Sequence, residues 1–554
     1  MQFRNDFIGV PSMKRKLIAI LIFITVFFST ACSDTEHLSP IEPKEPEKQE
    51  VAESPQSGGT VSLATTSNLN MDPLMANDEE TKAILSLIYE GLVRIDGQGM
   101  LQPALAESWQ IDEDGKIYTI NLRTDVKWHN GETFSSADVK ATFDRIKELK
   151  KSVKKVERPD FAEFDNIQSY EALDKNTFII SLYKPDADFL YGMTRGILSA
   201  SFIETLKTSK GTEKTASEYI GTGPFKVVSR SSDSVSLRRN DDYFGEKPYI
   251  EGMNIKIFPD NTAIKEAFNK RAVDMINIEP EDWNVFHEME DVYLLQYPSR
   301  YFEFIAVNLT NPILSDVNVR QAMLMGIDRN RILQDTTLGR GLVIDGPILP
   351  YSWAFNSNMQ QIMYNKRTAA QKLKEAGWED KDDDGILEKT IGKKKYKLEF
   401  ELLVNTSNGA RYQTASHIEK DLKDLGISVK LTNVTWDELK SKVMSKKYDT
   451  AVMGWKLAPN PDLQFMFASS EIKNGYNFVS YSNPELDDIL IQAKTDYESK
   501  KELLYEAQEI INRDLPYLFL YSPNEILALN KRLKGVEPDP INLFNNINEW
   551  WIKQ

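Results

Sequence analysis

The segment from Tyr448 to Phe465, YDTAVMGWKLAPNPDLQF, combines residue types that can bind a ligand. The apolar run Ala451-Val452-Met453 is typical of a buried central strand. Gly454 then allows a close approach to the backbone, and Trp455 offers a flat aromatic face. A tryptophan after a strand is also a common core residue. The segment therefore predicts a strand that leads into a loop, with Trp455 either in the core or in a binding wall.

Residues that could hold a metal or catalyse a reaction do not form a recognisable set. The four histidines are far apart in the sequence and form no HxxxH pair or Cys/His cluster: His37, His129, His287 and His417. Asp380, Asp382, Asp384 and Gly385 imitate the start of a calcium loop, but Ile391 occupies the twelfth position, where a glutamate is required. We expect a polar turn there. No Walker A loop, GxSxG elbow or dinucleotide fingerprint is present, so we expect no metal, no cofactor and no enzymatic activity.

The N-terminal sequence has the features of an export signal. Lys14, Arg15 and Lys16 form a basic region before an apolar run from Leu17 to Phe28, which is too short to span a bilayer comfortably. The only cysteine, Cys32, follows directly. This arrangement resembles a bacterial lipoprotein signal, although Ser29 stands where leucine is usual. The resemblance implies cleavage after residue 31 and an acylated Cys32 that anchors the protein at the extracytoplasmic face of the cell membrane.

The rest of the chain has the composition of a folded protein on a polar tether. Residues 32–57 contain four prolines and many charged side chains, so they cannot bury enough apolar surface to fold. Removing residues 1–31 leaves 63 basic and 82 acidic residues, a net charge of -19. This excess argues against nucleic-acid binding. At 554 residues the chain is long enough for two or three domains.

From Gly58 onward, alternating periodicities predict an α/β protein. Thr60 to Ala64 and Ile117 to Leu122 alternate as strands do, and Glu80 to Tyr89 has apolar residues at helical spacing. Pro103 to Trp109 is interpreted as a short helical turn. Ser135 or Ser136 can cap a helix that continues through Phe143.

Several motifs occur in the same order as in one known family. The opening set is YEGLVR, AESW, DGKIYTINLR and VKWHNGETFSSADV, between residues 89 and 139. The later set comprises Gly221-Thr222-Gly223-Pro224-Phe225, Leu237-Arg238-Arg239-Asn240, Val317 to Ala322, Gly326 to Arg329 and Ala376-Gly377-Trp378. Together they resemble the solute-binding proteins of peptide and nickel ABC transporters, family 5, over residues 58 to 554. Departures include Phe244 in place of the usual tryptophan.

The resemblance implies a type II periplasmic-binding-protein-like fold, with two lobes joined by a two-strand hinge and one inserted lobe. Lobe I would comprise residues 58–98, 221–307 and 529–554, lobe II residues 99–220, and lobe III residues 308–528. A ligand would lie between lobes I and III. The expected partners are an oligopeptide ligand and ABC permease subunits, and the protein is expected to be a monomer.

The family also implies which residues line the ligand site. In the loop after the strand these are Trp455, Lys456, Leu457, Asn460 and Asp462. Elsewhere they are Thr66, Ser67, Asn68, Tyr301, Phe302, Asn408, Arg411 and Tyr521, each of which also fits an ordinary turn, core or surface role.

One departure bears on the choice of ligand. Relatives that bind a free peptide amino end place an aspartate a few residues after the GW pair, but this chain has Lys456 to Pro459 there. Asp462 either replaces that carboxylate or caps a helix that starts near Leu463. The favoured function is peptide capture for import. A chelated nickel or another small solute is the alternative, and a secreted hydrolase lacks a nucleophile constellation.

Overall fold

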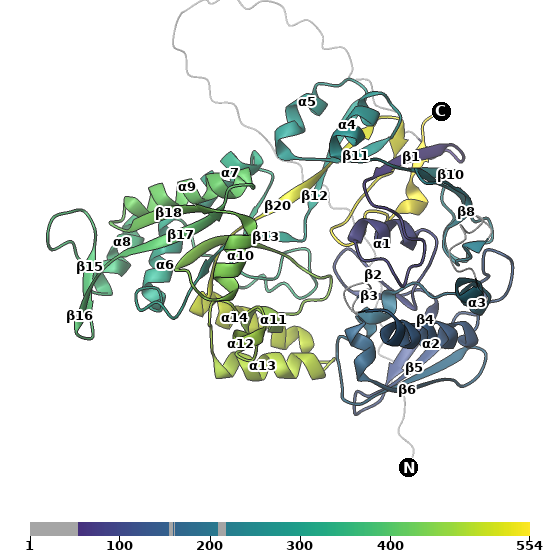
Figure 1. Ribbon diagram of the computed structural model, residues 1–554, viewed down its shortest axis with the longest axis horizontal. Helices are drawn as coiled ribbons and strands as arrows, with labels where there is room; N and C mark the ends of the chain where they lie inside the picture. The colour runs from purple at the N-terminus through teal and green to yellow at the C-terminus, as the bar shows by residue number, and fades with distance from the viewer. Residues whose placement is uncertain (1–53, 155–158, 160, 209–217) are drawn as a thin grey trace, which may run out of the picture. The chain divides into compact units, whose positions relative to one another are not determined.

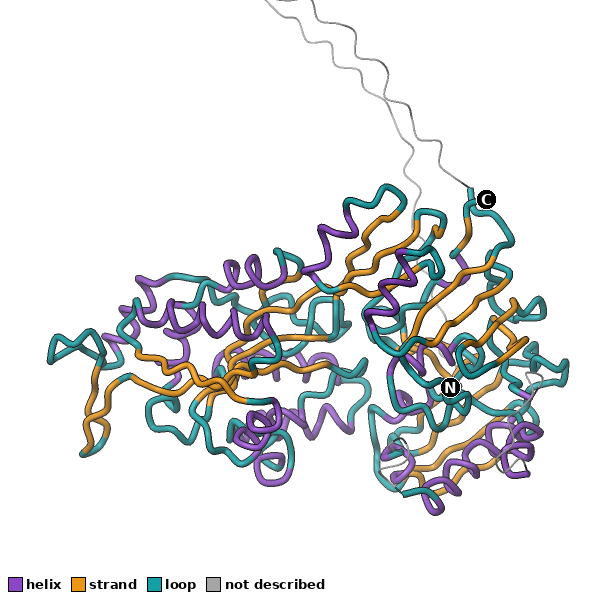
Figure 2. The backbone as a smooth tube through the Cα atoms, turned by 45° about the horizontal axis from the view of Figure 1, so that its top comes forward, coloured by secondary structure: helices purple, strands orange, loops and turns teal. Residues whose placement is uncertain are grey.

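A long mixed sheet runs through the folded body of the protein. The computed structural model describes residues 54–154, 159, 161–208 and 218–554. The predicted signal, Cys32 and the tether up to residue 53 lie outside these residues. The twelve-stranded sheet has the order β18-β17-β19-β13-β20-β11-β1-β10-β9-β8, and β12 and β14 also pair with β20. Figure 2 shows these strands in orange between purple helices.

One half of the sheet gathers segments from the start, the middle and the end of the chain. Its strands are β1 (Thr60–Thr65), β8 (Phe225–Arg230), β9 (Ser234–Arg239), β10 (Gly252–Ile257), β11 (Met275–Ile278) and β12 (Val292–Pro298). β1 pairs in parallel with β10 and β11, whereas β9 is antiparallel to β8 and β10. The helices of this half are α1 (Glu79–Ser86), α4 (Asn261–Asn269) and α5 (Trp283–His287).

The other half contains β13 (Tyr301–Val307), β14 (Gly341–Val343), β17 (Glu399–Asn405), β18 (Ser428–Val434) and β19 (Thr450–Lys456). Both of its faces are covered (Figure 1). One face packs against α6 (Val317–Gly326), α7 (Arg329–Thr337), α8 (Lys366–Glu375) and α9 (Gly409–Lys423). The other packs against α10 (Trp436–Met444), α11 (Gln464–Phe467), α12 (Glu471–Asn474), α13 (Pro484–Thr495) and α14 (Lys500–Asp514).

The side-chain alternation of β13 explains why this half needs two helical layers. Ile305 and Val307 enter the core beneath α6 to α9, while Phe302, Phe304 and Ala306 enter the core on the opposite face. A strand with both faces buried must be apolar almost throughout. The run Ala451-Val452-Met453 in β19 follows the same rule, as the sequence predicted, and all three residues are buried.

The strand β20 (Tyr517–Asn530) belongs to both halves of the sheet. Its first part pairs with β13 and β14, and its second part pairs with β11 and β12. Pairing with β14 ends at Pro523, and pairing with β12 begins at Asn524. The connection between the halves at this point is therefore main chain in extended conformation.

A separate four-stranded sheet has the order β4-β5-β7-β6. Its strands are β4 (Ala106–Ile111), β5 (Ile117–Leu122), β6 (Ile167–Ala172) and β7 (Thr177–Leu182), and residues of α2 (Ser136–Ser152) share its core. Smaller strand pairs are β2 (Val93–Ile95) with β3 (Leu101–Pro103), β15 (Glu388–Ile391) with β16 (Lys394–Lys397), and β21 (Leu533–Lys534) with β22 (Trp551–Ile552). Outside the sheets lie α3 (Ala200–Thr208) and four short 3-10 helices, η2 (Ala162–Asn166), η3 (Phe189–Thr194), η5 (Pro280–Asp282) and η6 (Ile547–Glu549).

One secondary-structure prediction is wrong. The expected helical turn from Pro103 to Trp109 is instead the end of β3 and most of β4. Alanine, leucine and glutamate in this stretch favour a helix, but Leu105 and Ala106 donate backbone hydrogen bonds to Gly91 and Leu92. Tertiary pairing thus overrides local propensity. The other predicted strands and helices are present, including α2 with Ser135 at its N-cap.

Among the described residues, none of the helices combines the length and apolar character needed to cross a membrane.

His129 connects two of the motifs seen in the sequence. Its Nδ1 accepts a hydrogen bond from the Gly221 backbone N–H (3.2 Å), and its Nε2 lies 3.0 Å from the Gly223 carbonyl oxygen. A neutral ring that carries its proton on Nε2 satisfies both contacts. Gly221 itself must lack a side chain, because a Cβ there would lie 1.9 Å from the Ile88 carbonyl oxygen. Burial and, to a smaller extent, the nearby charge of Lys226 together lower the pKa of His129 to about 4, against the opposing effect of the bond to Gly223.

We predict a pH-dependent contribution of His129 to stability. A folded-state pKa of about 4, against 6.5 when unfolded, means that the neutral ring stabilises the fold above pH 6.5. This contribution, up to about 3 kcal/mol, is lost as the pH falls from 6.5 towards 4. The free energy of unfolding should therefore be lower for His129→Ala than for the wild type at pH 7, with the gap closing near pH 4. His287→Ala, at an exposed site, is the control, and a gap that does not change with pH would contradict the assignment.

Candidate functional site

Three neighbouring cavities share the helix α1 as a wall. We name them the Arg300 cavity (about 440 Å³), the Tyr191 cavity (about 570 Å³) and the Phe244 cavity (about 700 Å³). Glu79 and Ala83 line the first and the third, while Lys82 and Ser86 line the second and the third. Volumes of this size suit small-molecule or peptide ligands.

The sequence before and within α1 explains how this shared wall is held. Asp78 is the N-cap, and its carboxylate accepts a hydrogen bond from the Thr81 backbone N–H (2.7 Å). Glu79 and Glu80 occupy the first turn, where negative charge stabilises a helix. Ile84 and Leu85 are buried in the core. The helix therefore presents its charged first turn to the cavities while its apolar face is fixed.

The loop after β19 reaches all three cavities. Lys456 lines the Arg300 cavity, and Asn460 lines both the Tyr191 and the Phe244 cavities. The loop also lies close to the backbone at Gly99, because a Cβ on Gly99 would be 2.8 Å from the Pro459 carbonyl oxygen. Residues that the sequence placed in one binding loop are thus brought to the cavities.

Arg300 ties the first turn of α1 to this loop. Its guanidinium donates to the Glu79 carboxylate and to the Leu457 carbonyl oxygen (2.9 Å). Burial opposes the charged form of Glu79, but the hydrogen bond and charge of Arg300 outweigh it and lower the pKa of Glu79. The Leu457 backbone N–H donates in turn to the Arg300 carbonyl oxygen (2.9 Å). The two segments therefore exchange hydrogen bonds in both directions.

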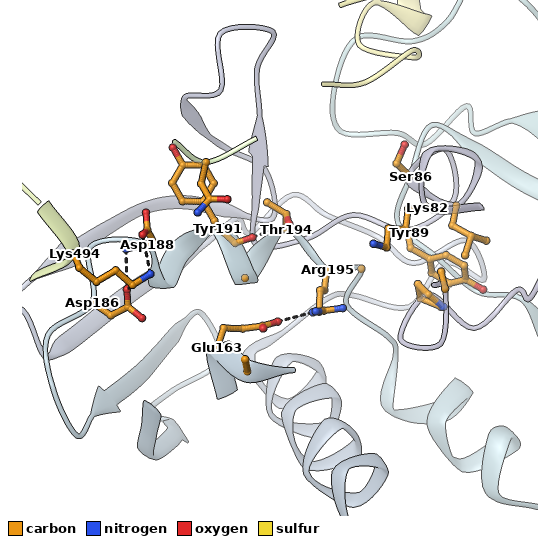
Figure 3. A pocket seen from close by; sticks show the side chains of 17 residues that line it. Lys82, Ser86, Tyr89, Glu163, Asp186, Asp188, Tyr191, Thr194, Arg195 and Lys494 are labelled. Atoms are coloured by element: carbon orange, nitrogen blue, oxygen red, sulfur yellow. Dashed lines mark hydrogen bonds and ion pairs between the residues drawn. The ribbon is translucent and has the colours of Figure 1, made fainter. Parts of the chain in front are cut away.

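The charges of the Tyr191 cavity neutralise one another (Figure 3). Arg195 donates to Glu163 (2.7 Å), and Lys494 donates to Asp188 (2.9 Å). Asp188 also accepts a hydrogen bond from Lys500, at the start of α14. Burial alone would raise the pKa of Asp188, but Lys500 and Lys494 lower it below its ordinary value. A ligand in this cavity meets side chains that already have ionic partners.

The Phe244 cavity contains an enclosed carboxyl group. Glu90 accepts hydrogen bonds from the Tyr243 hydroxyl (2.8 Å) and the Thr222 hydroxyl (3.1 Å). Burial raises the pKa of Glu90 to about 7, against the opposing effect of these hydrogen bonds. Arg123 lies over the ring of Phe244, 4.7 Å from its centre. Phe244, which replaces the family's usual tryptophan, therefore still provides an aromatic platform in the wall.

Gly454 makes room for an ion pair rather than for a ligand in this structure. Arg411, on α9, donates to both carboxylate oxygens of Glu303 on β13, at 2.8 and 2.9 Å. A Cβ on Gly454 would lie 2.4 Å from Arg411 Nη2 and 2.5 Å from Glu303 Oε1. Burial raises the pKa of Glu303 in spite of the opposing bond and charge of Arg411. The predicted site residue Arg411 is therefore paired with Glu303, and it lines none of the three cavities.

Trp455 is half-buried within an aromatic group. Its ring stacks on Phe478, with 5.9 Å between centres, and meets Phe465 and Tyr476 edge to face. Its Nε1–H lies 3.5 Å from the Tyr517 hydroxyl. Tyr476 is 50% exposed. Trp455 is thus held by aromatic packing, and it lines none of the three cavities, so its role in ligand binding stays a prediction.

The remaining predicted residues are spread over the elements around the cavities. Lys456 Nζ lies 5.2 Å from the ring centre of Tyr301, which is 38% exposed. Ser67 donates to Asp78 (2.9 Å) and Glu80 (3.1 Å), next to exposed Asn68. Thr66 lines the Arg300 cavity.

Four other predicted residues have structural partners. Asn408 caps α9 by accepting from the Arg411 backbone N–H (2.9 Å). Asp462 accepts from the Gln464 backbone N–H (2.8 Å), although the N-cap position of α11 is Leu463. Phe302 and Tyr521 are 0% and 2% exposed, so they are core residues and line none of the three cavities.

The sequence analysis missed several residues that line the Arg300 cavity: Glu79, Lys265, Glu279, Tyr297, Arg300, Glu525 and Asp539. Arg300 directly precedes the predicted Tyr301, so a charged residue beside an aromatic one was an available signal. Glu279 and Glu525 are more than two hundred positions apart, and only the pairing of β11 with β20 brings their segments together. No spacing rule could have joined them.

The aspartates of the predicted polar turn lie close together. Asp380, Asp382 and Asp384 are exposed, and their ligand atoms lie within 4.8 Å of one another. Lys397 forms an ion pair with Asp382 (3.3 Å) and another with Asp384. The cluster is therefore at least partly neutralised by a lysine of β16.

We predict that Arg411→Met destabilises the fold, because it leaves the Glu303 carboxylate buried without a partner. The expected loss is about 3 to 5 kcal/mol in the free energy of unfolding, and replacing both residues with Glu303→Leu and Arg411→Met should recover much of it. Lys140→Met, which removes an exposed pair with Asp144, should cost roughly 0.5 kcal/mol. Chemical denaturation measures all four proteins. A loss no larger than that of Lys140→Met would contradict a structural role for the pair.

Comparisons of the sequence and the structure with known proteins identify related proteins. The model of the bacterial extracellular solute-binding proteins, family 5 Middle, matches residues 100–477. The oligopeptide-binding protein AppA of Bacillus subtilis is 29% identical over 98% of this chain and 100% of its own length.

Solved structures show the same architecture. AppA from Bacillus subtilis, in complex with a nonapeptide, matches 90% of this chain and 100% of its own with a TM-score of 0.62 and 28% identity. NikZ from Campylobacter jejuni, in complex with Ni(L-His), matches 89% of this chain and 99% of its own with a TM-score of 0.65 and 27% identity. The fold is therefore α/β and type II periplasmic-binding-protein-like, as predicted, and the chain belongs to family 5 of the bacterial extracellular solute-binding proteins.

Proposed function

We propose that this protein is the extracytoplasmic receptor of an ABC importer and that its ligands are oligopeptides. The observation that carries the proposal is the group of three cavities around α1, joined by the loop after β19. Together they offer a long, polar and partly aromatic surface, which suits a ligand with a repeated main chain and varied side chains. The peptide-binding relatives support the same class of ligand.

The proposed mechanism is closure of lobes around the ligand. Lobe I is assigned to residues 58–98, 221–307 and 529–554, lobe II to residues 99–220, and lobe III to residues 308–528. Arg300, between β12 and β13, and the pairing switch in β20 lie where a hinge would bend. Ligand contacts on both sides of the cavities would favour the closed form, which the permease subunits would recognise. The protein acts as a monomer and is not an enzyme.

Anchoring completes the proposed function. Acylation of Cys32 would hold the receptor at the outer face of the membrane, and residues 33–57 would act as its spacer. Mass spectrometry of the membrane-extracted protein tests this, since a diacylated Cys32 at the N-terminus has a defined mass. An unmodified cysteine or an uncleaved leader would contradict it.

A second candidate ligand is a chelated nickel ion or another small solute. Two observations favour it: none of the residues from Lys456 to Pro459 is the aspartate that the family resemblance leads us to expect in a peptide binder, and NikZ, a neighbour of known structure, is in complex with Ni(L-His). Native mass spectrometry of gently purified protein separates the two candidates, because a co-purified peptide and a metal chelate differ in mass and isotope pattern.

We predict that peptides stabilise the protein and that Trp455 contributes to their binding. A panel of peptides of increasing length should raise the melting temperature, since a ligand at about 100 times its Kd adds roughly 2.7 kcal/mol. Trp455→Ala should weaken the tightest peptide roughly tenfold or more in calorimetric titration, as expected for a buried aromatic contact. Trp436→Ala, at a site 42% exposed on α10, is the matched control and should leave affinity unchanged. If no peptide raises the melting temperature, the first part of the prediction is wrong. If Trp455→Ala and Trp436→Ala bind the peptide with equal affinity, the second part is wrong.

A further inference from the structure

The Arg300 cavity contains charged groups of both signs that lack ionic partners. Lys456, at the end of β19, lines it, and among the described residues no carboxylate is recorded within 4.0 Å of its Nζ. Glu279 follows β11 and Glu525 lies on β20, and for the same part of the chain no ion pair is recorded for either. Lys456, Glu279 and Glu525 are therefore charged groups of this cavity that have no ion pair among the described residues.

Two other cations of the cavity are already paired: Arg300 with Glu79, and Lys265 with Asp282 (2.5 Å). Two further carboxylates have neutral partners only. Glu80 accepts from the Ser67 hydroxyl (3.1 Å), and Asp539 Oδ1 accepts from the backbone N–H groups of Ile541 and Asn542 (2.7 Å each), while Asp539 Oδ2 is buried without a hydrogen-bond partner. Lys456 remains the available cation, and it lies beside the Glu79–Arg300 pair, where it contributes to the lowered pKa of Glu79.

The acidic side is held in place by its own contacts. Glu525 accepts a hydrogen bond from the Tyr297 hydroxyl (2.6 Å), across the pairing of β20 with β12. Burial raises the pKa of Glu279, as do the negative charges of Glu281 and Glu525, although Lys265 acts in the opposite direction. A bound cation would relieve this repulsion between carboxylates.

The neighbouring cavity lacks this property. In the Tyr191 cavity, Glu163 pairs with Arg195 and Asp188 pairs with Lys494, so its ionic groups satisfy each other. The Arg300 cavity therefore differs from the Tyr191 cavity in having charged groups without an ion pair. In the loop beside it, Lys456 follows Trp455 directly, and no aspartate occurs before Asp462.

We propose that this cavity binds a short zwitterionic peptide with its α-ammonium group at Glu279 and Glu525 and its carboxylate group at Lys456. The inference rests on the proposed peptide-binding function and adds the direction in which the ligand lies. The ligand carboxylate neutralises the charge of Lys456. The ligand ammonium group donates to the carboxylates of Glu279 and Glu525, which have no ion pair of their own. A basic or acidic ligand side chain carries the same chemistry, so the test uses peptides with uncharged side chains.

The test combines changes to the ligand with changes to the protein. The tightest-binding peptide with uncharged side chains is compared, by calorimetric titration, with its N-acetylated form and its C-terminal amide. The proteins are the wild type, Lys456→Met, and the double variant Glu279→Gln with Glu525→Gln. The matched controls are Lys447→Met and Glu288→Gln, at exposed positions outside the cavity lining. Melting temperatures confirm that each variant is folded.

The proposal predicts two separate couplings. Amidation of the peptide should weaken binding to the wild type about tenfold or more. It should weaken binding to Lys456→Met less than about threefold, because this variant already lacks the interaction between Lys456 and the ligand carboxylate. N-acetylation should weaken binding to the wild type by a similar factor, but should have little further effect in the double glutamine variant. Both control variants should behave like the wild type.

Two outcomes overturn the proposal in distinguishable ways. In the first outcome, peptides bind, but Lys456→Met removes the effect of acetylation instead of the effect of amidation, or the variants leave the effects of both modifications unchanged. The assigned direction is then wrong, while peptide binding stands. If no peptide of any length binds the wild-type protein, the proposed function fails together with this inference.

Discussion

The main-chain hydrogen bonds of β20 are the constraint on which the rest of the structure depends. This strand of fourteen residues pairs with β13 and β14 over its first part and with β11 and β12 over its second. Both halves of the long sheet are therefore attached to one extended segment. The cavities around α1 lie close to this segment, since Glu525 and Leu527 of β20 line the Arg300 cavity. The chain also passes between the halves at Arg300, between β12 and β13, and Arg300 lines the same cavity.

The cavities differ in how many of their charged side chains form ion pairs with one another. Salt bridges around Asp188 and Glu163 neutralise the Tyr191 cavity, and the Glu303–Arg411 pair neutralises the space left by Gly454. A buried ion pair is costly to break, because the remaining partner is left without compensation. Such pairs fix the shape of the walls. The uncompensated groups Lys456, Glu279 and Glu525 are then the ones that can respond to a ligand.

The loop after β19 shows how a family pattern can be kept while its chemistry changes. The GW pair is present, and Trp455 still lies at the edge of an aromatic group. The carboxylate that follows in peptide-binding relatives is absent, and Asp462 accepts a backbone hydrogen bond at the start of α11 instead. Glu525 of β20 and Glu279, which follows β11, line the Arg300 cavity, so the carboxylates beside Lys456 come from other elements of the fold.

The sequence by itself determined the α/β class, the family and most of the strands and helices. Strong periodicity in β5, β19 and α2 survives folding because burial of one face, or of both, enforces it. It also predicted the strand that ends at Trp455 and the loop that follows. Only the tertiary structure decided that Ala106 to Trp109 is extended, that Arg411 is paired with Glu303, and that Glu279 and Glu525 line one cavity. The physical reason is that these outcomes depend on backbone pairing and charge contacts between segments far apart in the chain, which local propensity does not encode.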